Sequence, residues 1–441
     1  MDKVAIDLLI EAEWVIPVQP HGVVLEDYAV AVDHGRIVAL LPSVDARQRY
    51  APRETVSRPG HALIPGLVNS HCHSAMVLMR GLADDLPLMA WLQDHIWPTE
   101  AKFVGAEMVA DGTLIAAAEL LRGGVTCVNE MYYFPEVAAA TLKRVGLRAA
   151  VGLTVIEFPT AWASHADEYI DKGLALADEL KHESMLRACW APHAPYTVSD
   201  ASFEKIRMYS DQLDIPVHVH LHETAFEVAD ALRQHKERPF SRLKRLGLVN
   251  RNLIAVHMTQ LTESEIAQCA EAGVSIAHCP ESNLKLASGF APIEALRRAG
   301  VNIALGTDGA ASNNDLDLIG EMKTAAQLAK AVAQDAAALD AASALRMATL
   351  GGARALGWDE RIGSIEVGKD ADLTLIALDE FDTLPVYHPI SHVVYASNRR
   401  DVRDVWVRGE RKLDGGRLTG FDIERLAATA RSWGARMRRK E

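Results

Sequence analysis

Short apolar runs rich in β-branched residues alternate with longer segments of helical periodicity from Ala62 to Asp308. The intervening segments, such as Asp200–Leu213 and Thr262–Ala272, have the length and apolar spacing of amphipathic helices. Strand–helix units repeated in this way predict a closed parallel (β/α)₈ TIM-like barrel, whose strands are apolar throughout because helices cover them outside. The predicted strands are Ala62–Asn69, Val125–Glu130, Arg148–Val155, Leu186–His193, Pro216–His222, Asn252–His257, Val274–His278 and Val301–Asp308.

The two ends of the chain have a different pattern. Ala5–Val56 and Ile365–Leu413 contain alternating strand-like runs and glycine turns, with no strong helical period before Phe421. We expect turns at His34–Gly35 and Asp414–Gly415, and one small β-sandwich domain formed by both chain ends. The Ala-rich segment Glu321–Leu356 is predicted to be helical and to close the barrel. The predicted domains are residues 1–61 plus 365–420 for the sandwich, 62–364 for the barrel and 421–441 for a C-terminal helix.

The composition is that of an ordinary globular protein, with 441 residues of which 49% are hydrophobic and 24% charged. A formal net charge of −13 argues against a nucleic-acid backbone or an anionic membrane surface as the main partner. The five cysteines are odd in number and widely spaced, which favours a reducing cytoplasm over a disulfide framework. Acidic residues interrupt Met1–Pro20, and no apolar stretch is long enough to span a bilayer, so we expect a cytoplasmic protein without a signal peptide.

Candidate chemistry collects at the carboxyl ends of the predicted strands. In a parallel barrel these ends meet on one face, where the active sites of this fold lie. Histidine or a carboxylate at nearly every strand end therefore predicts a single site on that face. The residues are His71, His73, Glu130, His193, His218, His220, His222, Glu223, His257, His278 and Asp308.

Two histidine patterns indicate a metal. His71 and His73 are two residues apart, so on a strand both side chains point the same way and reach one ion. An isolated pair of this kind favours two hydrogen-bonded histidines near a turn, but three further candidate ligands at other strand ends reverse that choice. His218, His220 and His222 also share one strand face, where unpartnered polar groups are costly. Metal ligation by one of them, with the others hydrogen-bonded, resolves this, although spacing does not say which one ligates.

Asp308 ends an apolar strand and is followed by a loop, which favours a functional carboxylate over a helix N-cap. For His193 and His257 the sequence leaves two interpretations open, a functional role or a hydrogen-bonded histidine of the core. No lysine, which a two-metal site often uses as a bridging ligand, ends the third or fourth predicted strand, so we expect one metal ion. A mixed nitrogen and oxygen ligand set with an open position suits Zn²⁺, and Fe²⁺ also fits.

These motifs resemble the amidohydrolase superfamily over essentially the whole chain. Within it the chain is most similar to the branch that includes 5′-methylthioadenosine/S-adenosylhomocysteine deaminases, and guanine deaminases and chlorotriazine hydrolases are more distant. The matching blocks are Leu63–His73, Met79–Asp85, Trp91–Leu92, Trp97–Glu100, Ala191–Tyr196, His220–Thr224, His278–Leu286, Gly306–Gly309 and Ile365–Leu373.

The resemblance implies a role for each candidate residue and an association into a homo-oligomer. It identifies the ligating histidine as the one three residues before the catalytic glutamate. The implied metal ligands are His71, His73, His220 and Asp308; the implied catalytic residues are Glu223, His257 and Asp308; the implied substrate-binding residues are Trp91, Glu100, His193 and Glu223.

The reaction implied is the hydrolytic deamination of an adenosine-type purine nucleoside. Hydroxide, available near neutral pH because a bound metal lowers the pKa of water, attacks C6 of adenine. Asp308 takes a proton from the attacking water, Glu223 delivers one to N1, and His257 stabilises the oxygen. Ammonia leaves after a second proton transfer. Glu100 is expected to bind the ribose hydroxyls and His193 to contact the purine.

The expected substrate is 5′-methylthioadenosine, with adenosine next. The carboxylate of S-adenosylhomocysteine normally calls for an arginine clamp, yet Ala149–Asp171, expected near the mouth of the site, has no Lys or Arg. The alternative is a guanine deaminase or a chlorotriazine hydrolase on the same scaffold. Glu100, Trp91 and Trp97 favour a nucleoside substrate over these two. A non-catalytic assembly protein is more remote, because none of the four expected metal ligands is missing.

Overall fold

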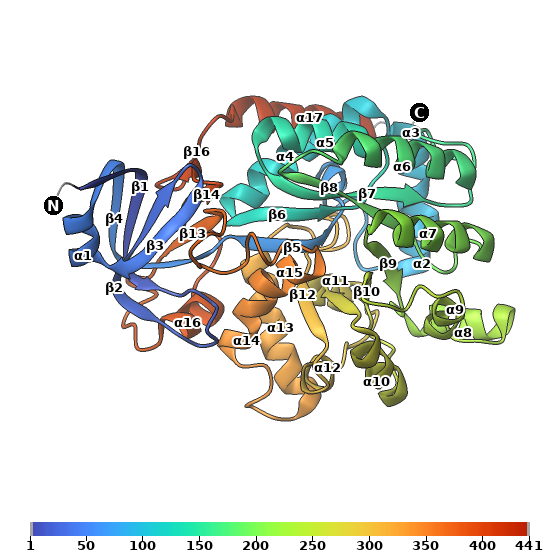
Figure 1. Ribbon diagram of the computed structural model, residues 1–441. Helices are drawn as coiled ribbons and strands as arrows, with labels where there is room; N and C mark the ends of the chain where they lie inside the picture. The colour runs from blue at the N-terminus through green and yellow to red at the C-terminus, as the bar shows by residue number, and fades with distance from the viewer. Residues whose placement is uncertain (1–2, 439–441) are drawn as a thin grey trace.

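A closed parallel barrel takes up most of the chain, which the computed structural model describes over residues 3–438 (Figure 1). The eight barrel strands, β5 to β12, lie in the sheet in the order in which they occur in the sequence. An isolated parallel bridge between Cys72 and Asp308 joins the last strand to the first, and the Asp308 amide donates to the His71 carbonyl at 3.0 Å. The predicted (β/α)₈ barrel is confirmed. Its strands are β5 Leu67–Cys72, β6 Val125–Glu130, β7 Arg148–Val155, β8 Leu186–Pro192, β9 Val217–Leu221, β10 Leu253–His257, β11 Ser275–His278 and β12 Asn302–Leu305.

The predicted strands from Val125 onward coincide with β6 to β12 to within a few residues, but the first one does not. The predicted strand Ala62–Asn69 spans two elements, because its first half ends β4 (Tyr50–Pro65) in the smaller sheet. The chain passes between the sheets at Gly66, where an added Cβ would lie 2.1 Å from Thr126 Oγ1. The apolar run is continuous across this junction because both sheets bury it.

Helices cover the outside of the barrel, as predicted. Helix α7 has the predicted bounds, and α10 begins one residue later because Thr262 is its N-cap, in a reciprocal capping box with Glu265. The helical segments, including the 3-10 helix η1 and the π-helical turns η2 and η3, are η1 Ser74–Met79, α2 Leu88–Trp91, η2 Leu92–Ile96, α3 Trp97–Phe103, α4 Ala106–Arg122, α5 Pro135–Val145, α6 Ala166–Leu180, α7 Asp200–Leu213, α8 Ala225–His235, α9 Pro239–Arg245, α10 Glu263–Ala272, α11 Pro280–Lys285, α12 Ile293–Arg298, α13 Leu318–Ala333, α14 Ala341–Arg346, η3 Met347–Gly351 and α15 Gly352–Ala355.

Both chain ends build the smaller structure, as predicted, and its strands form one mixed eight-stranded sheet in the order β16-β15-β14-β13-β4-β1-β2-β3. The predicted turn at His34–Gly35 joins β2 to β3, and Gly415 and Gly416 turn the chain between β15 and β16. Helix α1 was not predicted, because it buries only Ala46 and so leaves no apolar period. The remaining elements are β1 Val4–Val15, β2 Leu25–Asp33, β3 Arg36–Pro42, α1 Ser43–Arg49, β13 Leu373–Ala377, α16 Pro389–Ser391, η4 His392–Ala396, β14 Val402–Val407, β15 Glu410–Asp414 and β16 Arg417–Leu418.

A buried cation joins the two parts. Arg148, at the start of β7, pairs with Asp370 at 2.9 Å and with Asp372 at 3.0 Å, and all three side chains are almost fully buried. Such a cluster fixes the small sheet against the barrel, because removing the guanidinium would leave the buried Asp372 carboxylate without its cationic partner, while Arg361 still pairs with Asp370 at 2.7 Å.

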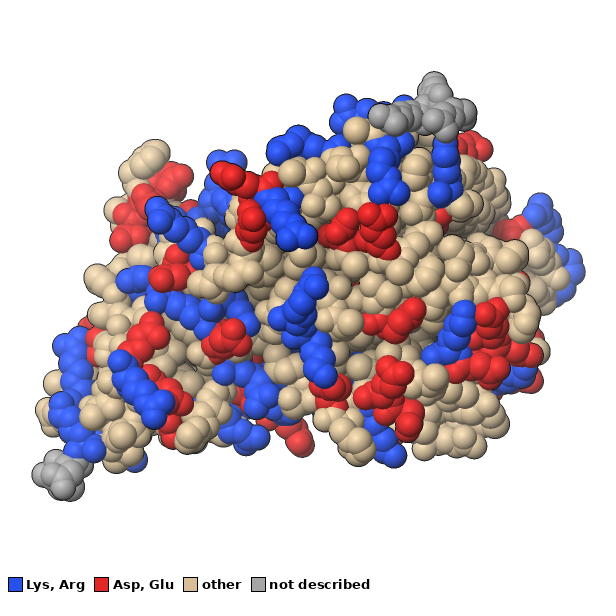
Figure 2. Space-filling model, turned by 90° about the horizontal axis from the view of Figure 1, so that it is seen from above, with Lys and Arg blue, Asp and Glu red and all other residues tan. Residues whose placement is uncertain are grey.

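The C-terminal helix α17 (Ile423–Arg438) packs back on the barrel, where the Trp433 indole donates to Asp111 at 2.8 Å. Residues 1–2 of the predicted small domain and 439–441 of the predicted helix lie outside the described residues. Basic and acidic side chains are interspersed over the face in Figure 2. None of the helices within residues 3–438 combines the length and the apolarity needed to cross a membrane.

Candidate active site

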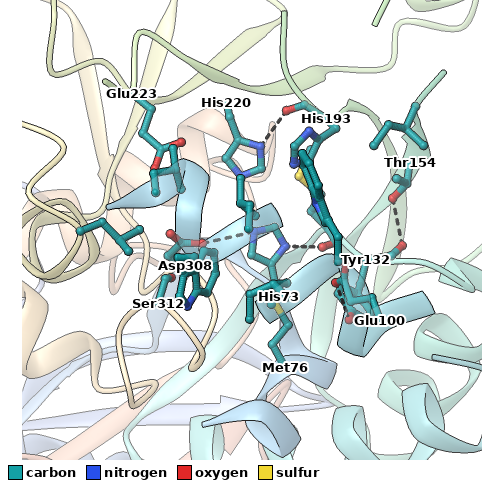
Figure 3. Close-up of a pocket in the computed structure, with 18 of the residues that line it drawn as sticks. His73, Met76, Glu100, Tyr132, Thr154, His193, His220, Glu223, Asp308 and Ser312 are labelled. Atoms are coloured by element: carbon teal, nitrogen blue, oxygen red, sulfur yellow. Dashed lines mark hydrogen bonds and ion pairs between the residues drawn. The ribbon is translucent and has the colours of Figure 1, made fainter. Parts of the chain in front are cut away.

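A pocket opens at the carboxyl ends of the barrel strands, and residues from most of these ends converge on it (Figure 3). His71 is fully buried beside the pocket, while the other predicted site residues line it. The structure therefore brings together the metal-binding, catalytic and substrate-binding residues that the resemblance implied. Those lining the pocket are His73, Trp91, Glu100, His193, His220, Glu223, His257 and Asp308.

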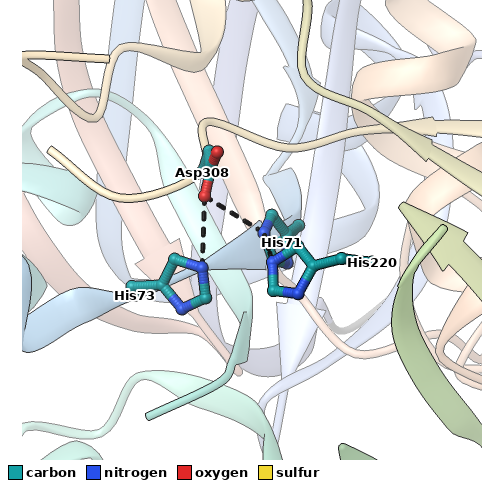
Figure 4. Close-up of side chains that lie close together, drawn as sticks. All are labelled: His71, His73, His220 and Asp308. Carbon is teal, nitrogen blue, oxygen red and sulfur yellow. Dashed lines mark hydrogen bonds and ion pairs between the residues drawn. The ribbon is translucent and has the colours of Figure 1, made fainter. Parts of the chain in front are cut away.

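His71, His73, His220 and Asp308 form a compact cluster, in which one ligand atom of each lies within 4.8 Å of all the others (Figure 4). Asp308 Oδ1 lies 3.1 Å from His71 Nε2 and 3.2 Å from His73 Nε2, and the Nε2 atoms of His71 and His220 are 3.2 Å apart. Ligand atoms about 2.0–2.1 Å from a tetrahedral zinc ion lie roughly 3.3 Å from one another. The spacing of the cluster therefore fits a divalent metal ion.

Backbone carbonyls set the tautomers of two of these histidines. His73 Nδ1 donates to the Met131 carbonyl, and His220 Nδ1 donates to the His193 carbonyl at 2.7 Å. With Nδ1 protonated, each Nε2 presents a lone pair to the centre of the cluster. Lone pairs that converge in a buried site repel one another unless a cation lies between them, so the chemistry of the donor set also fits a metal.

The three histidines in β9 and directly after it have different surroundings. His218 Nε2 lies 3.0 Å from His71 Nδ1, on the side of that ring away from the cluster. The expectation that His222 shares their face is wrong, because its φ of 52° turns the ring away, and its Nε2 accepts the Phe240 amide at 3.1 Å. Among these three, only His220 joins the cluster, as the resemblance implied.

Asp308 adopts a left-handed backbone conformation with φ 59°, which a non-glycine residue rarely takes. It begins no helix, and its own carboxylate accepts the Gly309 amide at 2.8 Å. The second oxygen, Oδ2, accepts the Ser282 hydroxyl at 2.7 Å. The carboxylate is thus held from two sides with Oδ1 facing the histidines, which agrees with a functional role rather than an N-cap.

Glu223 occupies the turn between β9 and α8. The Glu227 carboxylate accepts the backbone amides of His222 at 3.1 Å and Glu223 at 2.7 Å, which fixes this turn. Burial, reinforced by the nearby charge of Asp308, raises the pKa of Glu223 to about 8. The side chain therefore holds a proton at neutral pH and has the properties of a general acid.

His257 lies beside this glutamate, with its Nε2 3.8 Å from Glu223 Oε2. Its Nδ1 faces Asn283 Oδ1 at 2.8 Å. Burial lowers the pKa of His257, so the ring is neutral. A neutral imidazole with its Nδ1 hydrogen directed to Asn283 presents an accepting Nε2 to the pocket.

Glu100 and His193 lie on the other walls of the pocket. Tyr132 donates its hydroxyl to Glu100 Oε1 at 2.8 Å, and burial raises the pKa of Glu100 to about 7. Burial lowers the pKa of His193 to about 3, and its Nδ1 lies 2.9 Å from Thr197 Oγ1. A neutral His193 is suited to hydrogen-bond a heterocycle without adding charge.

The contacts made by Ser282 and Asn283 were not predicted. Ser282 and Asn283 lie within the quoted His278–Leu286 block, but the six-residue helix α11 gives no periodic signal for their orientation. Glu130 and His278, two of the strand-end candidates, lie outside the cluster. Glu130 instead accepts the Ser74 amide at 2.9 Å.

Comparisons with known proteins agree with this geometry. The family model described as the amidohydrolase family matches residues 62–412. The 5-methylthioadenosine/S-adenosylhomocysteine deaminase of Teredinibacter turnerae is 45% identical over 428 residues, covering 97% of each chain. The enzyme of the same name from Saccharophagus degradans is 42% identical, over 98% of this chain and 97% of its own. A crystal structure of an adenosine deaminase from Xanthomonas campestris with bound zinc is 61% identical, covers 99% of this chain and 100% of its own, and superposes with a TM-score of 0.98.

Proposed function

This chain belongs to the amidohydrolase family, and we propose that it is a metal-dependent hydrolase that deaminates adenosine-type nucleosides, with 5′-methylthioadenosine as the preferred substrate. The observation that carries the proposal is the buried Glu223 carboxyl in one pocket with a His₃Asp cluster. The products are 5′-methylthioinosine and ammonia. The names of the full-length relatives, at 45% and 42% identity, support the substrate class over guanine or a chlorotriazine.

In this proposal His71, His73, His220 and Asp308 hold one divalent ion, for which the donor set and the zinc in the similar crystal structure favour Zn²⁺. When bound, such an ion lowers the pKa of water and so supplies hydroxide near neutral pH.

The residues of the chain then move the protons. Asp308 orients the attacking water and accepts one of its protons, since Ser282 holds the carboxylate in place. Glu223 delivers its proton to N1 of adenine as oxygen adds to C6, which prevents negative charge from building on the ring. His257 Nε2, next to Glu223, accepts a hydrogen bond from the incoming oxygen and steadies it during attack. A second proton transfer to the exocyclic amine releases ammonia.

Glu100 and His193 orient the substrate. We assign the Glu100 carboxyl, positioned by the Tyr132 hydroxyl, to the ribose hydroxyls, and the neutral His193 ring to the purine. Trp91, whose indole nitrogen is buried and has no partner within residues 3–438, lines the same pocket and offers a further donor.

The test is to incubate zinc-loaded protein with 5′-methylthioadenosine, adenosine, S-adenosylhomocysteine, guanine and a chlorotriazine, and to identify the products by mass spectrometry. We expect ammonia with 5′-methylthioinosine and inosine, and slower conversion of S-adenosylhomocysteine. Turnover of guanine or the chlorotriazine, with none of the adenosine nucleosides, would replace this proposal by the corresponding alternative.

A further inference from the structure

A buried glutamate on α13 contacts two of the segments at the carboxyl end of the barrel. The side chain of Glu321 is completely buried in the first turn of this helix. Its Oε1 accepts the side-chain amide of Asn313, in the loop after β12, and its Oε2 accepts the backbone amide of Glu281, in α11, at 3.2 Å. One carboxyl group therefore joins the loop that carries Asp308 to the helix that carries Ser282.

The burial of this carboxyl is not balanced by an ion pair within the described residues. A buried carboxyl without a cation is unfavourable unless its oxygens are hydrogen-bonded. Burial, together with the nearby charge of Glu281, raises the pKa of Glu321 well above its usual range. Both oxygens can accept hydrogen bonds in either protonation state, since a protonated carboxyl keeps lone pairs on each of them. What Glu321 contributes is therefore its two hydrogen bonds, one to each segment.

The contact with Asn313 leads directly to Asp308. The same Asn313 amide donates to the Thr307 carbonyl at 2.7 Å. Asn69, on β5, holds the same residue, because its Oδ1 accepts the Thr307 amide at 3.0 Å and its Nδ2 donates to the Thr307 hydroxyl at 2.8 Å. Thr307 is thus fixed by two side-chain amides immediately before the left-handed Asp308. A strained backbone of this kind persists only where the surrounding contacts determine it.

The contact with Glu281 holds the second support of Asp308. Glu281 and Ser282 are consecutive in α11, and the Ser282 hydroxyl donates to Asp308 Oδ2 at 2.7 Å. Thr324, on α13, donates its hydroxyl to Glu281 Oε1 at 2.7 Å and so fixes the same end of α11. The backbone of Asp308 and its serine partner are therefore both anchored to α13.

We propose that Glu321 is a positioning residue, which sets the place of Asp308 relative to the three histidines of the cluster without touching substrate or metal. The inference rests on the proposed function, in which Asp308 both holds the ion and accepts a proton from water. Both tasks require the carboxylate at a fixed distance and angle, and a displacement of about 1 Å can lower a rate by about 100-fold.

The test measures zinc affinity and steady-state kinetics in Glu321→Gln. Glutamine has nearly the same shape, but its amide nitrogen accepts no hydrogen bond, so one of the two segments loses its contact. We expect zinc binding, measured by competition with a chromophoric chelator, to weaken by about tenfold. At saturating zinc, kcat for 5′-methylthioadenosine should fall by about tenfold and KM should change by less than about threefold. The chelator measurement needs no turnover, so it tests the inference separately from the deaminase assignment.

The matched control is Glu294→Gln, at a second buried carboxyl on a barrel helix. Glu294, in α12, accepts the Leu339 amide at 3.1 Å and so holds the loop that follows α13, at the other end of that helix from Glu321. This variant should lose stability but keep the zinc affinity and kcat of the wild type. Equal losses in both variants, or wild-type zinc affinity and kcat in Glu321→Gln, would overturn the inference.

A second variant tests the contact path without altering the helix. Asn313→Ala, at a half-buried loop position, removes both amide contacts and should also lower kcat by about tenfold. Since the two residues act through one contact, the variant that combines Glu321→Gln with Asn313→Ala should lose less than the product of the two single losses. Fully multiplied losses, or wild-type zinc affinity and kcat in Asn313→Ala, would contradict the path from Glu321 to Asp308.

Discussion

Asn283 Oδ1 lies 2.8 Å from His257 Nδ1, and both side chains are almost completely buried. The preceding residue, Ser282, donates to Asp308 Oδ2 at 2.7 Å. One turn of α11 therefore orients two groups that the proposed reaction uses, and it does so without touching the substrate. Partners of this kind fix ring tautomers and carboxylate directions in metal enzymes.

Replacing the amide tests this relationship. Asn283→Ala should lower kcat for 5′-methylthioadenosine by about 10- to 100-fold, since His257 loses the partner that keeps its Nδ1 protonated, while KM changes by less than about threefold. Steady-state kinetics measure kcat and KM separately. The control is Asn302→Ala, whose amide donates to Ser275 and to the Gly351 carbonyl near the amino ends of β11 and β12. An equal loss in both variants would indicate a general loss of stability instead.

His218 should influence metal affinity through His71. Its Nε2 lies 3.0 Å from His71 Nδ1, so His218→Ala frees the His71 ring and should weaken zinc binding by about 10- to 100-fold. Competition with a chromophoric chelator measures this without any turnover. His222→Gln, at a buried histidine directed to the Phe240 amide instead, should bind zinc like the wild type. Wild-type zinc affinity in His218→Ala would remove His218 from this role.

The pH dependence should follow Glu223. Its carboxyl must be protonated to supply a proton to N1, and its pKa is about 8, so kcat/KM should fall as the pH rises above about 8. The zinc content of the protein is measured at each pH, so that loss of metal is not mistaken for loss of the proton. A rate that still rises between pH 8 and pH 10 would show that the ionised carboxylate is the active form.

Glu100 should recognise the ribose. Glu100→Gln lowers kcat/KM for adenosine by about 10- to 100-fold, because a hydrogen bond to a carboxylate contributes about 1.5–3 kcal/mol. The same substitution should change kcat/KM for 2′,3′-dideoxyadenosine by less than about threefold, since that analogue lacks both hydroxyls. Equal losses on the two substrates would place Glu100 elsewhere in the reaction.

The barrel was predictable because burial leaves a direct trace in the sequence. Every position of β6 and β7 is buried, so apolar residues lie on both faces of each strand. The same signal failed at Ala62–Asn69, where two sheets bury consecutive stretches and only Gly66 marks the passage. Helix α1 was not predicted for the opposite reason. It buries only Ala46, so its sequence has no helical period of apolar residues.

The site was predictable in its members but not in its contacts. Strand-end positions identify the candidates, because the topology gathers those ends whatever their separation in sequence. His222 turns away from the cluster because its own backbone is left-handed. The alternation expected for a strand gives no sign of this.

The most direct test of the central claim is a zinc titration of metal-free protein with 5′-methylthioadenosine, following the ultraviolet change from adenine to hypoxanthine. We expect no conversion without metal, a rate that rises linearly and levels off at about one equivalent of zinc per chain, and a Glu223→Gln variant that binds zinc equally but loses at least about 100-fold in rate. Full conversion by metal-free protein, or undiminished turnover by Glu223→Gln, would contradict it.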